Sequence, residues 1–284
     1  MRALDPQVKA IVWEAFEPLI PVPVDQHPLG RHRRRKADRL AFEVMITRIA
    51  TGCSWEDAER LCGNQISDTT ARSRRDEWVE AGIYERLVNE ALLAFDKVIG
   101  LQFGDVAADG SLHKAPAGGV GTGKSPVDRS KRGWKWHILT DLGGIPFGWV
   151  ADGANRNDSI LLEPTLLDAE RRGWLSQVTT IWLDRGYDSD ATRERLAAFG
   201  IDDAVIAKKR KRGSTGPTPR QPMGLRWQVE RTNSWLSNFG QLRRNTDRKP
   251  EHRLAQLALA IVFIITAKLI DWRKRWVPDL SPIR

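Results

Sequence analysis

Cysteine is scarce in this chain, because only Cys53 and Cys62 occur among 284 residues. Two cysteines cannot build a disulfide framework or supply the four ligands of a structural zinc ion. We expect no signal peptide, since Trp13 and Glu14 interrupt any apolar segment near the N-terminus. Together these absences favour a reducing, cytoplasmic setting.

Long apolar runs and negative charge are also in short supply. The most apolar stretch, residues 254–270, contains Gln256 and Lys268 and is too short to span a bilayer comfortably, so it predicts a buried core helix and no membrane partner. The chain has 36 acidic residues against 45 basic ones, a net charge of +9. That surplus favours a polyanionic partner, most often nucleic acid, although a basic soluble protein without such a partner shows the same balance.

The periodicity of the apolar residues changes near residue 99. Before this point the spacing is helical, which predicts an all-helical domain over residues 1–98, with helices at 8–19, 40–49, 55–61, 69–79 and 83–95. After it, residues 99–284 predict an α/β domain with a mixed sheet. The expected order is three strands, helix, strand, helix, strand and two helices, at 103–115, 133–154 (two strands), 159–172, 178–184, 189–199, 202–209, 223–239 and from 251 onward.

The stretch GGVGTGKS, residues 118–125, fits the nucleotide-binding pattern G-x-x-x-x-G-K-[ST]. A phosphate-binding loop needs a buried strand before it and a helix that begins at the Lys-Ser pair. Pro126 disfavours a helical backbone at Ser125, and both flanking segments are polar, so an NTPase is the weakest interpretation. We interpret the stretch as a flexible basic loop that contacts DNA phosphates through Lys124, Arg129, Lys131, Arg132 and Lys135.

Three carboxylates are candidates for one metal site. Asp109 lies on an expected strand directly before Gly110, which would let a hydroxyl or phosphate approach closely. Asp184 follows the apolar run TTIWL at the carboxyl end of another expected strand, where ligands of α/β sheets gather. Glu230 lies at the edge of the apolar stripe of an expected helix. Carboxylate oxygens suit magnesium, and two such ions can support phosphodiester chemistry.

Each of these acids also has a purely structural alternative. Asp109 and Asp184 could be turn formers at strand ends, and Glu230 could pair with Arg226 one helical turn away. The order strand-Asp, strand-Asp, helix-Glu, with a basic loop before the helix, is much less expected by chance than any single one of them.

Several segments resemble the DDE transposases of bacterial insertion sequences, in the insertion-sequence-five group, whose catalytic domain is RNase H-like. The segments that carry this resemblance are VAADGS around Asp109, residues 125–149 and 151–159, LDRGYDS around Asp184, VERTNSWL around Glu230, LRRNTDR, and in the helical region TGCSWEDAERLCG and RRDEWVEAGIYERL. The resemblance implies that Asp109, Asp184 and Glu230 are catalytic residues that bind Mg²⁺, for which Mn²⁺ would substitute.

Transposases of this broad class carry a signature in which Tyr, Arg, Glu and Lys follow at gaps of two, three and six residues. Arg226 and Glu230 match it, whereas Met223 and Ser237 stand where Tyr and Lys are expected. The resemblance therefore implies DNA contacts by Arg226, and it leaves Arg231, or the arginines at 243 and 244, as substitutes for the missing lysine.

The helical region offers a candidate DNA-binding motif. Residues 55–61, a turn at 63–65 and a helix capped by Ser67 or Asp68 predict a helix-turn-helix. Four residues near the start of its second helix are placed to reach bases or phosphates: Thr69, Thr70, Arg72 and Arg75. A plain helical packing domain is the alternative.

Two further basic segments are candidates for contact with the DNA backbone. The first, Arg31 to Lys36, fits a solvated charge run nearly as well. The second precedes the Glu230 helix and has five consecutive cations, Lys208, Lys209, Arg210, Lys211 and Arg212. Most of the 12 tryptophans are expected in cores, with Trp227 or Trp235 as candidates to stack on an unpaired base.

The sequence thus predicts a transposase that binds the terminal inverted repeats of an insertion sequence and catalyses metal-dependent DNA cleavage and strand transfer. Its expected partners are double-stranded DNA, as transposon ends and as target, and a second copy of itself. We expect it in the bacterial cytoplasm, at the nucleoid. The alternative is a non-catalytic, domesticated DNA-binding protein derived from a transposase, which would bind the ends without cutting them.

Overall fold

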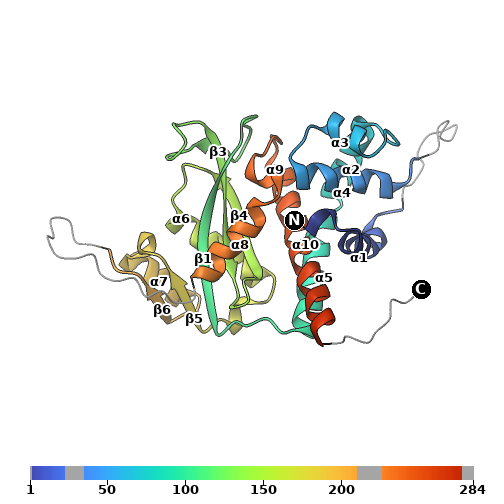
Figure 1. Cartoon of the computed structure of the whole chain (residues 1–284). Helices are drawn as coiled ribbons and strands as arrows, with labels where there is room; N and C mark the ends of the chain where they lie inside the picture. Colours follow the sequence, from blue (N-terminus) through green and yellow to red (C-terminus); the bar gives the residue numbers. More distant parts are fainter. Residues whose placement is uncertain (1, 23–34, 210–225, 277–284) are drawn as a thin grey trace. The chain divides into compact units, whose positions relative to one another are not determined.

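A computed structural model of the chain describes residues 2–22, 35–209 and 226–276 (Figure 1). The chain divides into two compact units. The helical unit runs from the N-terminus to Ile99 and includes Asn238–Asn245 and the chain from Glu251 onward. The sheet unit comprises Gly100–Ser237 and Thr246–Pro250.

The helical unit contains the five predicted N-terminal helices, the long helix predicted near residue 251, and one short helix at residues 240–243 that was not predicted. They are α1 (Pro6–Phe16), α2 (Asp38–Thr51), α3 (Trp55–Leu61), α4 (Asp68–Glu80), α5 (Ile83–Val98), α9 (Gly240–Arg243) and α10 (Pro250–Trp276), with short 3₁₀ turns η1 (Arg2–Leu4) and η2 (Glu17–Leu19). Phe16 packs in the core against Phe42 and Trp78, with ring centroids 5.2 and 4.8 Å apart. Ser67 caps α4 by accepting a hydrogen bond from the Thr70 amide, as the sequence predicts.

Helices α2 and α9 meet backbone to backbone within the helical unit. Gly52 ends α2 with a φ of 80°, and a Cβ on Gly240 would lie 2.4 Å from the carbonyl carbon of Thr51. Only glycine permits this approach. The contact ties residues far apart in the sequence into one unit.

The predicted boundary therefore differs from the observed division. We expected residues 99–284 to form one continuous domain, whereas α9 and α10 belong with the N-terminal helices. Helix α10 contributes His252, Ala255 and Gln256 to a small cavity that Met45 and Tyr84 also line. A single boundary along the sequence cannot describe this division, because the chain leaves the helical unit after Ile99 and again after Asn245 and returns to it each time.

Among the described helices, α10 alone is long and apolar enough to cross a membrane. About 67% of its most apolar window is buried in the protein, which agrees with the expected core helix.

The sheet unit alternates strands and helices in the predicted order, with one extra short strand. Its elements are β1 (Asp105–Lys114), β2 (Gly123–Lys124), β3 (Arg132–Thr140), β4 (Pro146–Gly153), α6 (Asp158–Arg171), η3 (Leu175–Gln177), β5 (Thr180–Leu183), η4 (Arg185–Tyr187), α7 (Asp190–Ala198), β6 (Asp203–Ile206) and α8 (Trp227–Ser237). Strands β4, β3, β1, β5 and β6 follow each other across the sheet, and β2 pairs with the start of β3. Strand β3 is antiparallel to both neighbours, and β5 and β6 run parallel to β1, which is the RNase H-like arrangement.

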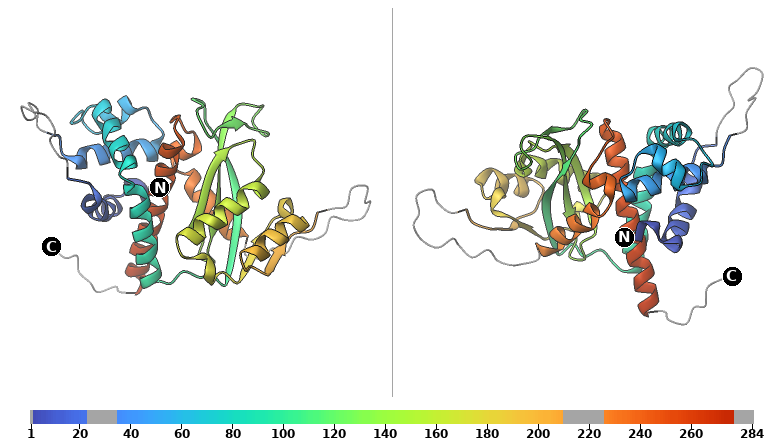
Figure 2. Two further views of the ribbon diagram at one scale, coloured as in Figure 1. Left: turned by 180° about the vertical axis from the view of Figure 1, so that it is seen from behind. Right: turned by 45° about the horizontal axis from the view of Figure 1, so that its top comes forward.

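Helices cover both faces of this sheet (Figures 1 and 2). Helix α6 packs on β3 and β4, and α8 packs across β1 and β3 from the other face. Because side chains alternate along a strand, Lys135 and His137 point toward α6, whereas Trp136 points toward α8. This alternation decides which side chains can meet at each face.

The glycine-rich stretch lies in the sheet unit and has a structural explanation. A Cβ on Gly119, whose φ is 105°, would lie 2.0 Å from the Arg248 carbonyl oxygen, and a Cβ on Gly123 would lie 1.6 Å from the Asn155 side chain. Lys124 ends a two-residue strand where a nucleotide-binding loop would begin a helix. The glycines allow close packing here.

Candidate active site

Asp109 lies on β1, and Asp184 directly follows β5, the parallel neighbour of β1. Strand β1 pairs with β5 in a constant register, from Asp105 opposite Thr180 to Ala107 opposite Trp182. Continued two residues beyond the paired segment, the same offset places Asp184 level with Asp109. The electrostatic influence of Asp184 on Asp109 is consistent with this proximity.

A chain of hydrogen bonds holds Asp109 from the α8 face. The indole Nε1 of Trp136, a fully buried residue of β3, donates to Asn233 Oδ1 at 2.8 Å. This bond orients the amide so that Asn233 Nδ2 donates to Asp109 Oδ2 at 3.4 Å. Asn233 lies one turn after Glu230 on α8, so it links the strand aspartate to the helix of the third acid.

The electrostatic environment of Asp109 is unfavourable to its charge. Desolvation by burial is the main cause that raises the pKa of Asp109, to about 7; the charges of Asp158 and Asp184 act in the same direction, and the charge of Arg226 opposes them. Near neutral pH this carboxyl is therefore only partly ionised. A perturbed carboxyl among like charges is typical of a functional site.

Asp184 is held in a tight turn. It precedes η4, and its Oδ1 accepts a hydrogen bond from the Gly186 amide at 2.6 Å. A Cβ on Gly186 would lie 2.7 Å from the same oxygen, so glycine lets the carboxylate fold back onto the turn. The turn-forming alternative and the site role are thus both compatible with Asp184.

Glu230 lies on the exposed side of α8. Its side chain is 59% exposed, and Oε1 is 3.3 Å from Arg226 Nη2. Arg226 is only 17% exposed, but a single pair one helical turn apart contributes only a few tenths of a kcal/mol, about 0.2–0.5, so pairing alone does not account for the acid. Among the described residues, no three His, Cys, Asp or Glu side chains lie close enough to hold one metal ion. The predicted triad is therefore not assembled as a three-ligand group in this conformation.

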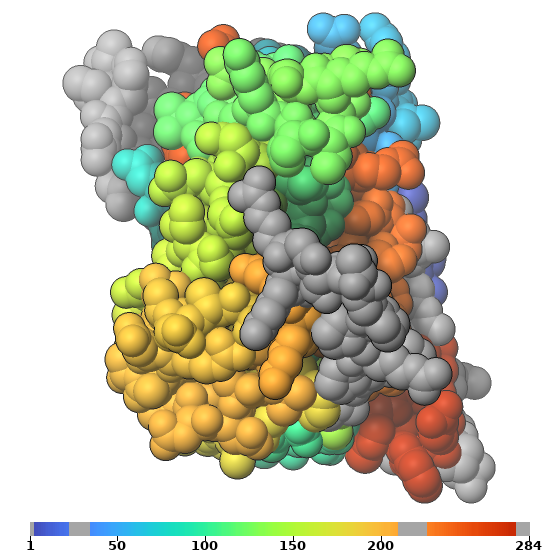
Figure 3. Space-filling view, turned by 90° about the vertical axis from the view of Figure 1, so that its left-hand side faces the viewer, coloured from blue at the N-terminus to red at the C-terminus, as the bar shows by residue number. Residues whose placement is uncertain are grey.

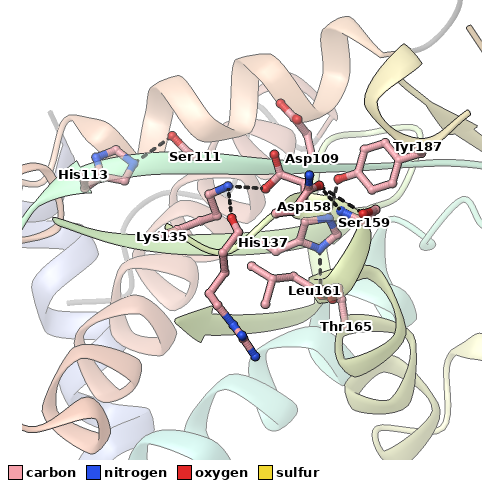
Figure 4. A network of polar contacts seen from close by, with 12 residues as sticks. Asp109, Ser111, His113, Lys135, His137, Asp158, Ser159, Leu161, Thr165 and Tyr187 are labelled. Atoms are coloured by element: carbon pink, nitrogen blue, oxygen red, sulfur yellow. Dashed lines mark hydrogen bonds and ion pairs between the residues drawn. The ribbon is translucent and has the colours of Figure 1, made fainter. Parts of the chain in front are cut away.

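A fourth carboxylate, Asp158, lies beside Asp109 and was missed by the sequence reasoning. It occupies the first turn of α6, and its Oδ1 accepts a hydrogen bond of 2.7 Å from the ammonium of Lys135, with which it forms an ion pair (Figure 4). A Cβ on Gly110 would lie 2.0 Å from the same oxygen. Gly110 therefore makes room for Asp158, which corrects the expectation that it admits a hydroxyl or phosphate. The motif ANRNDS contained the signal, an aspartate directly after the helix-capping Asn157.

Lys135 also corrects an expectation. We predicted it as part of a basic loop, but it lies within β3, it is 5% exposed, and its ammonium donates to the Arg156 carbonyl as well as to Asp158. Lys135 is therefore an internal counter-charge of the site, because strand alternation turns its side chain toward α6.

A second group missed by the sequence reasoning lies under the site on the α6 face. His137 Nδ1 is 2.7 Å from Thr165 Oγ1, and His137 Nε2 is 2.6 Å from the hydroxyl of Tyr187 (Figure 4). Burial lowers the pKa of His137 to about 3 and raises that of Tyr187 well above its usual value. Only the GY in LDRGYDS hinted at Tyr187, since its partner His137 is fifty residues away in the sequence.

The predicted DNA contacts of the sheet unit comprise exposed residues and residues outside the described part of the chain. Lys124, Arg129, Lys131, Lys208 and Lys209 are exposed, whereas Arg210, Lys211 and Arg212 lie outside the described residues. Figure 3 shows the green segment between β1 and β3 and the yellow-orange segment of α7 and β6 at opposite ends of one face of the sheet unit.

Arg231 has structural partners that the sequence did not predict. Its guanidinium stacks on Trp227 and Trp235, with its central carbon 4.3 and 4.7 Å from their ring centroids, and it donates to the Gly143 carbonyl at 2.8 Å. Trp227 is 50% exposed. The arginine thus braces α8 against the turn between β3 and β4.

In the helical unit, α3 and α4 form the predicted pair of helices, and the predicted DNA contacts differ in exposure. Thr69 and Arg72 are exposed, and Thr70 is half-buried. Arg75 packs over the ring of Trp55 at 5.1 Å, and its side chain is 11% exposed. Arg75 therefore has a packing role whether or not it meets DNA. From the other basic segment, Arg35 pairs with Asp38 at 2.8 Å, and residues 31–34 lie outside the described residues.

Comparisons with known proteins identify the family of this chain. The family described as "Transposase DDE domain" matches residues 104–265, more than half of the chain, and "Putative transposase of IS4/5 family" matches residues 10–88. A Burkholderia cepacia protein named "Putative transposase for insertion sequence element IS402" is 39% identical over 150 residues, which cover 50% of this chain and 67% of that protein. A second Burkholderia cepacia protein, "Insertion element IS402 uncharacterized 16.2 kDa protein", is 28% identical over 117 residues, 40% of this chain and 78% of that protein.

Solved structures give weaker similarity. The pre-cleavage Mos1 transpososome is 12% identical with a TM-score of 0.27, covering 87% of this chain and 82% of that one. The Mos1 strand transfer complex is 12% identical with a TM-score of 0.28, at the same coverage. The RNase H-like strand order, the two level aspartates and the family matches agree, and the chain belongs to the DDE transposases of the IS4/5 group.

Proposed function

We propose that this transposase binds the terminal inverted repeats of its insertion sequence and catalyses metal-dependent DNA cleavage and strand transfer. The observation that carries the proposal is the pair Asp109, on β1, and Asp184, directly after the parallel strand β5, with burial and the neighbouring acids raising the pKa of Asp109 to about 7. Family membership supplies the chemistry that such a pair serves.

The donor set at the site fits a hard divalent cation. Asp109, Asp184 and Glu230 bring carboxylate oxygens, which Mg²⁺ and Mn²⁺ favour. A cation would also relieve the repulsion that raises the pKa of Asp109. In this proposal Asp109, Asp184 and Glu230 would hold the metal, which when bound would supply activation of the attacking oxygen and charge stabilisation of the leaving one.

The chain's own residues position these acids. Asn233 orients Asp109, the Gly186 amide orients Asp184, and Arg226 supplies positive charge beside both Asp109 and Glu230. Because Glu230 is largely exposed on α8, we infer that bound DNA and metal complete the triad that the free protein leaves open.

Basic residues on both units are the proposed DNA contacts. Thr69, Thr70 and Arg72 on α4 would read or position the transposon end, and Lys124, Arg129, Lys131 and the basic segment from Lys208 would neutralise phosphates. We further propose a homodimer, since two ends must be cut together, acting at the nucleoid of a bacterial cytoplasm.

Cleavage of a duplex that carries the element's ends tests this function. Wild-type protein should cut it with Mg²⁺ or Mn²⁺, and Asp184→Asn should lower the rate at least about 10³-fold, which is about 4 kcal/mol of barrier. Asp105→Asn is the matched control, because Asp105 also lies on β1 but accepts a 2.7 Å bond from the Trp182 indole, a bond that asparagine retains. The control should cut at nearly the wild-type rate.

The outcomes separate the two functions that the sequence left open. End binding without cleavage in any divalent metal would establish the non-catalytic DNA-binding protein instead. Equal cleavage by wild type and Asp184→Asn would show that Asp184 is not needed for cleavage, although the protein would still be a nuclease.

A further inference from the structure

A continuous hydrogen-bond chain runs from helix α6 to the turn that carries Asp184. It consists of the Leu161 carbonyl, the Thr165 hydroxyl, the His137 imidazole and the Tyr187 hydroxyl, and all three side chains are buried (Figure 4). None of these groups has a role in the proposed chemistry, although the chain ends three residues after Asp184.

The direction of every proton in this chain follows from one bond. Thr165 Oγ1 donates its single proton to the Leu161 carbonyl at 2.7 Å. Toward His137 the hydroxyl can therefore only accept, so His137 Nδ1 carries the proton across their 2.7 Å contact. Burial keeps the ring neutral, which leaves Nε2 without a proton. Tyr187 must then donate its hydroxyl proton to Nε2, at 2.6 Å.

The donated bond fixes the far end of a short turn. The Tyr187 amide donates to the Asp184 carbonyl at 3.1 Å, and the Gly186 amide donates to the Asp184 carboxylate. With the phenol anchored on His137, the turn from Asp184 to Tyr187 is held at both ends. His137 lies on β3 opposite Gly110, the residue that follows Asp109 on β1. The hydrogen bond from Tyr187 therefore fixes the position of the Asp184 turn relative to these two strands.

We infer that Tyr187 is a positioning residue for Asp184, held as a hydrogen-bond donor by an Nδ1-protonated His137 whose tautomer Thr165 determines. This inference rests on the proposed function, in which Asp184 holds metal. Residues that orient metal ligands through hydrogen bonds commonly change metal affinity 10- to 100-fold when they are replaced.

Tyr187→Phe tests the inference, with Tyr84→Phe as a matched control. The chain has only these two tyrosines. Both are buried, but the Tyr84 hydroxyl makes one 3.4 Å contact with Met45 Sδ in the helical unit. In metal-free protein, Tyr187→Phe should speed hydrogen exchange of the Gly186 amide about 10-fold relative to the amides of β3, because the turn opens locally. It should also weaken Mn²⁺ binding about 10- to 100-fold, and Tyr84→Phe should do neither.

Two Thr165 variants test the tautomer. Thr165→Ser keeps the hydroxyl and should behave as wild type, whereas Thr165→Val removes the acceptor of the Nδ1 proton. The nitrogen chemical shifts of His137 should show an Nδ1–H ring in wild type and in Thr165→Ser, and an Nε2–H ring in Thr165→Val. Thr165→Val should also reproduce the faster Gly186 exchange. The double variant with Tyr187→Phe should exchange the Gly186 amide no faster than either single variant, because both substitutions break the same hydrogen-bond chain.

Two results overturn the inference, whichever way the metal measurement falls. One is an Nε2–H ring in the wild-type protein, and the other is Gly186 exchange that Tyr187→Phe leaves unchanged. Wild-type protein that binds no Mn²⁺ contradicts the proposed function instead, and the exchange and tautomer measurements still decide the role of Tyr187.

Discussion

Carboxylates are treated oppositely in the two units. In the helical unit Asp38 lies 2.8 Å from both Arg35 and Arg74, and Glu77 pairs with the same two arginines at 2.9 and 2.7 Å. In the sheet unit Asp109 faces the charges of Asp158 and Asp184, with Arg226 as its opposing cation.

The contrast separates acids that stabilise the fold from acids that are held despite their cost. A carboxylate between arginines gains from its charge, whereas one desolvated among like charges is destabilised by ionisation. Residues in environments that are unfavourable to their charge are expected at functional sites. Asp38 and Glu77 of the helical unit thus stabilise the fold through their arginine partners, whereas the environment of Asp109 in the sheet unit fits the metal-binding role that we propose for it.

The same substitution should change stability in opposite directions in the two units. At pH 8, Asp109→Asn should raise the free energy of unfolding by about 2–4 kcal/mol, because it removes a buried charge, and Asp38→Asn should lower it by about 1–3 kcal/mol. The folded-state pKa of Asp109 is raised from 3.8 to about 7, so the wild-type penalty is absent below about pH 4, grows as the pH rises from there toward 7, and is complete above 7. Urea denaturation of both variants between pH 4 and 8 measures the effect, and a pH-independent gain in Asp109→Asn would contradict it.

The sheet unit should also be destabilised by acid through a buried histidine. Burial lowers the pKa of His137 to about 3, so its contribution is complete above the unfolded value near 6.5 and is lost as the pH falls from there. At pH 5 the loss is about 2 kcal/mol. Proton NMR of the imidazole signals checks this directly: the His137 ring should not titrate above about pH 4, and a midpoint between pH 6 and 7 would refute the expectation.

Two helix caps should give the smallest effects and still distinguish the units. Ser67 caps α4 and Ser189 caps α7, each through a hydroxyl that accepts an amide proton. Replacing either serine with alanine should cost about 1 kcal/mol of stability. In a binding titration with an end-carrying duplex, only Ser67→Ala should weaken the complex, since α4 is the proposed DNA-reading helix. Equal weakening by Ser189→Ala would move that contact to the sheet unit.

Local patterns were sufficient to predict most elements of both units. Hydrophobic alternation placed β1, β3 and β4, the Ser67 cap placed the start of α4, and Pro126 excluded a helix after the glycine-rich stretch. Family-like motifs around Asp109 and Asp184 led to the two aspartates that the sheet brings level. These features depend on residues close together in the chain, so a sequence can show them.

The remaining features depend on pairs far apart in the sequence. In the sequence Lys135 is one more basic residue near a loop, and only its place in β3 shows that it pairs with Asp158. Likewise, nothing close to Tyr187 in the sequence indicates that its hydroxyl contacts His137. The sequence by itself determined the order of the elements, the basic surface and the family, because periodicity, charge and local motifs act over a few residues. Only the tertiary structure decided the return of α10 to the helical unit and the neighbours of each acid, because strand register and helix packing join residues that no local rule relates.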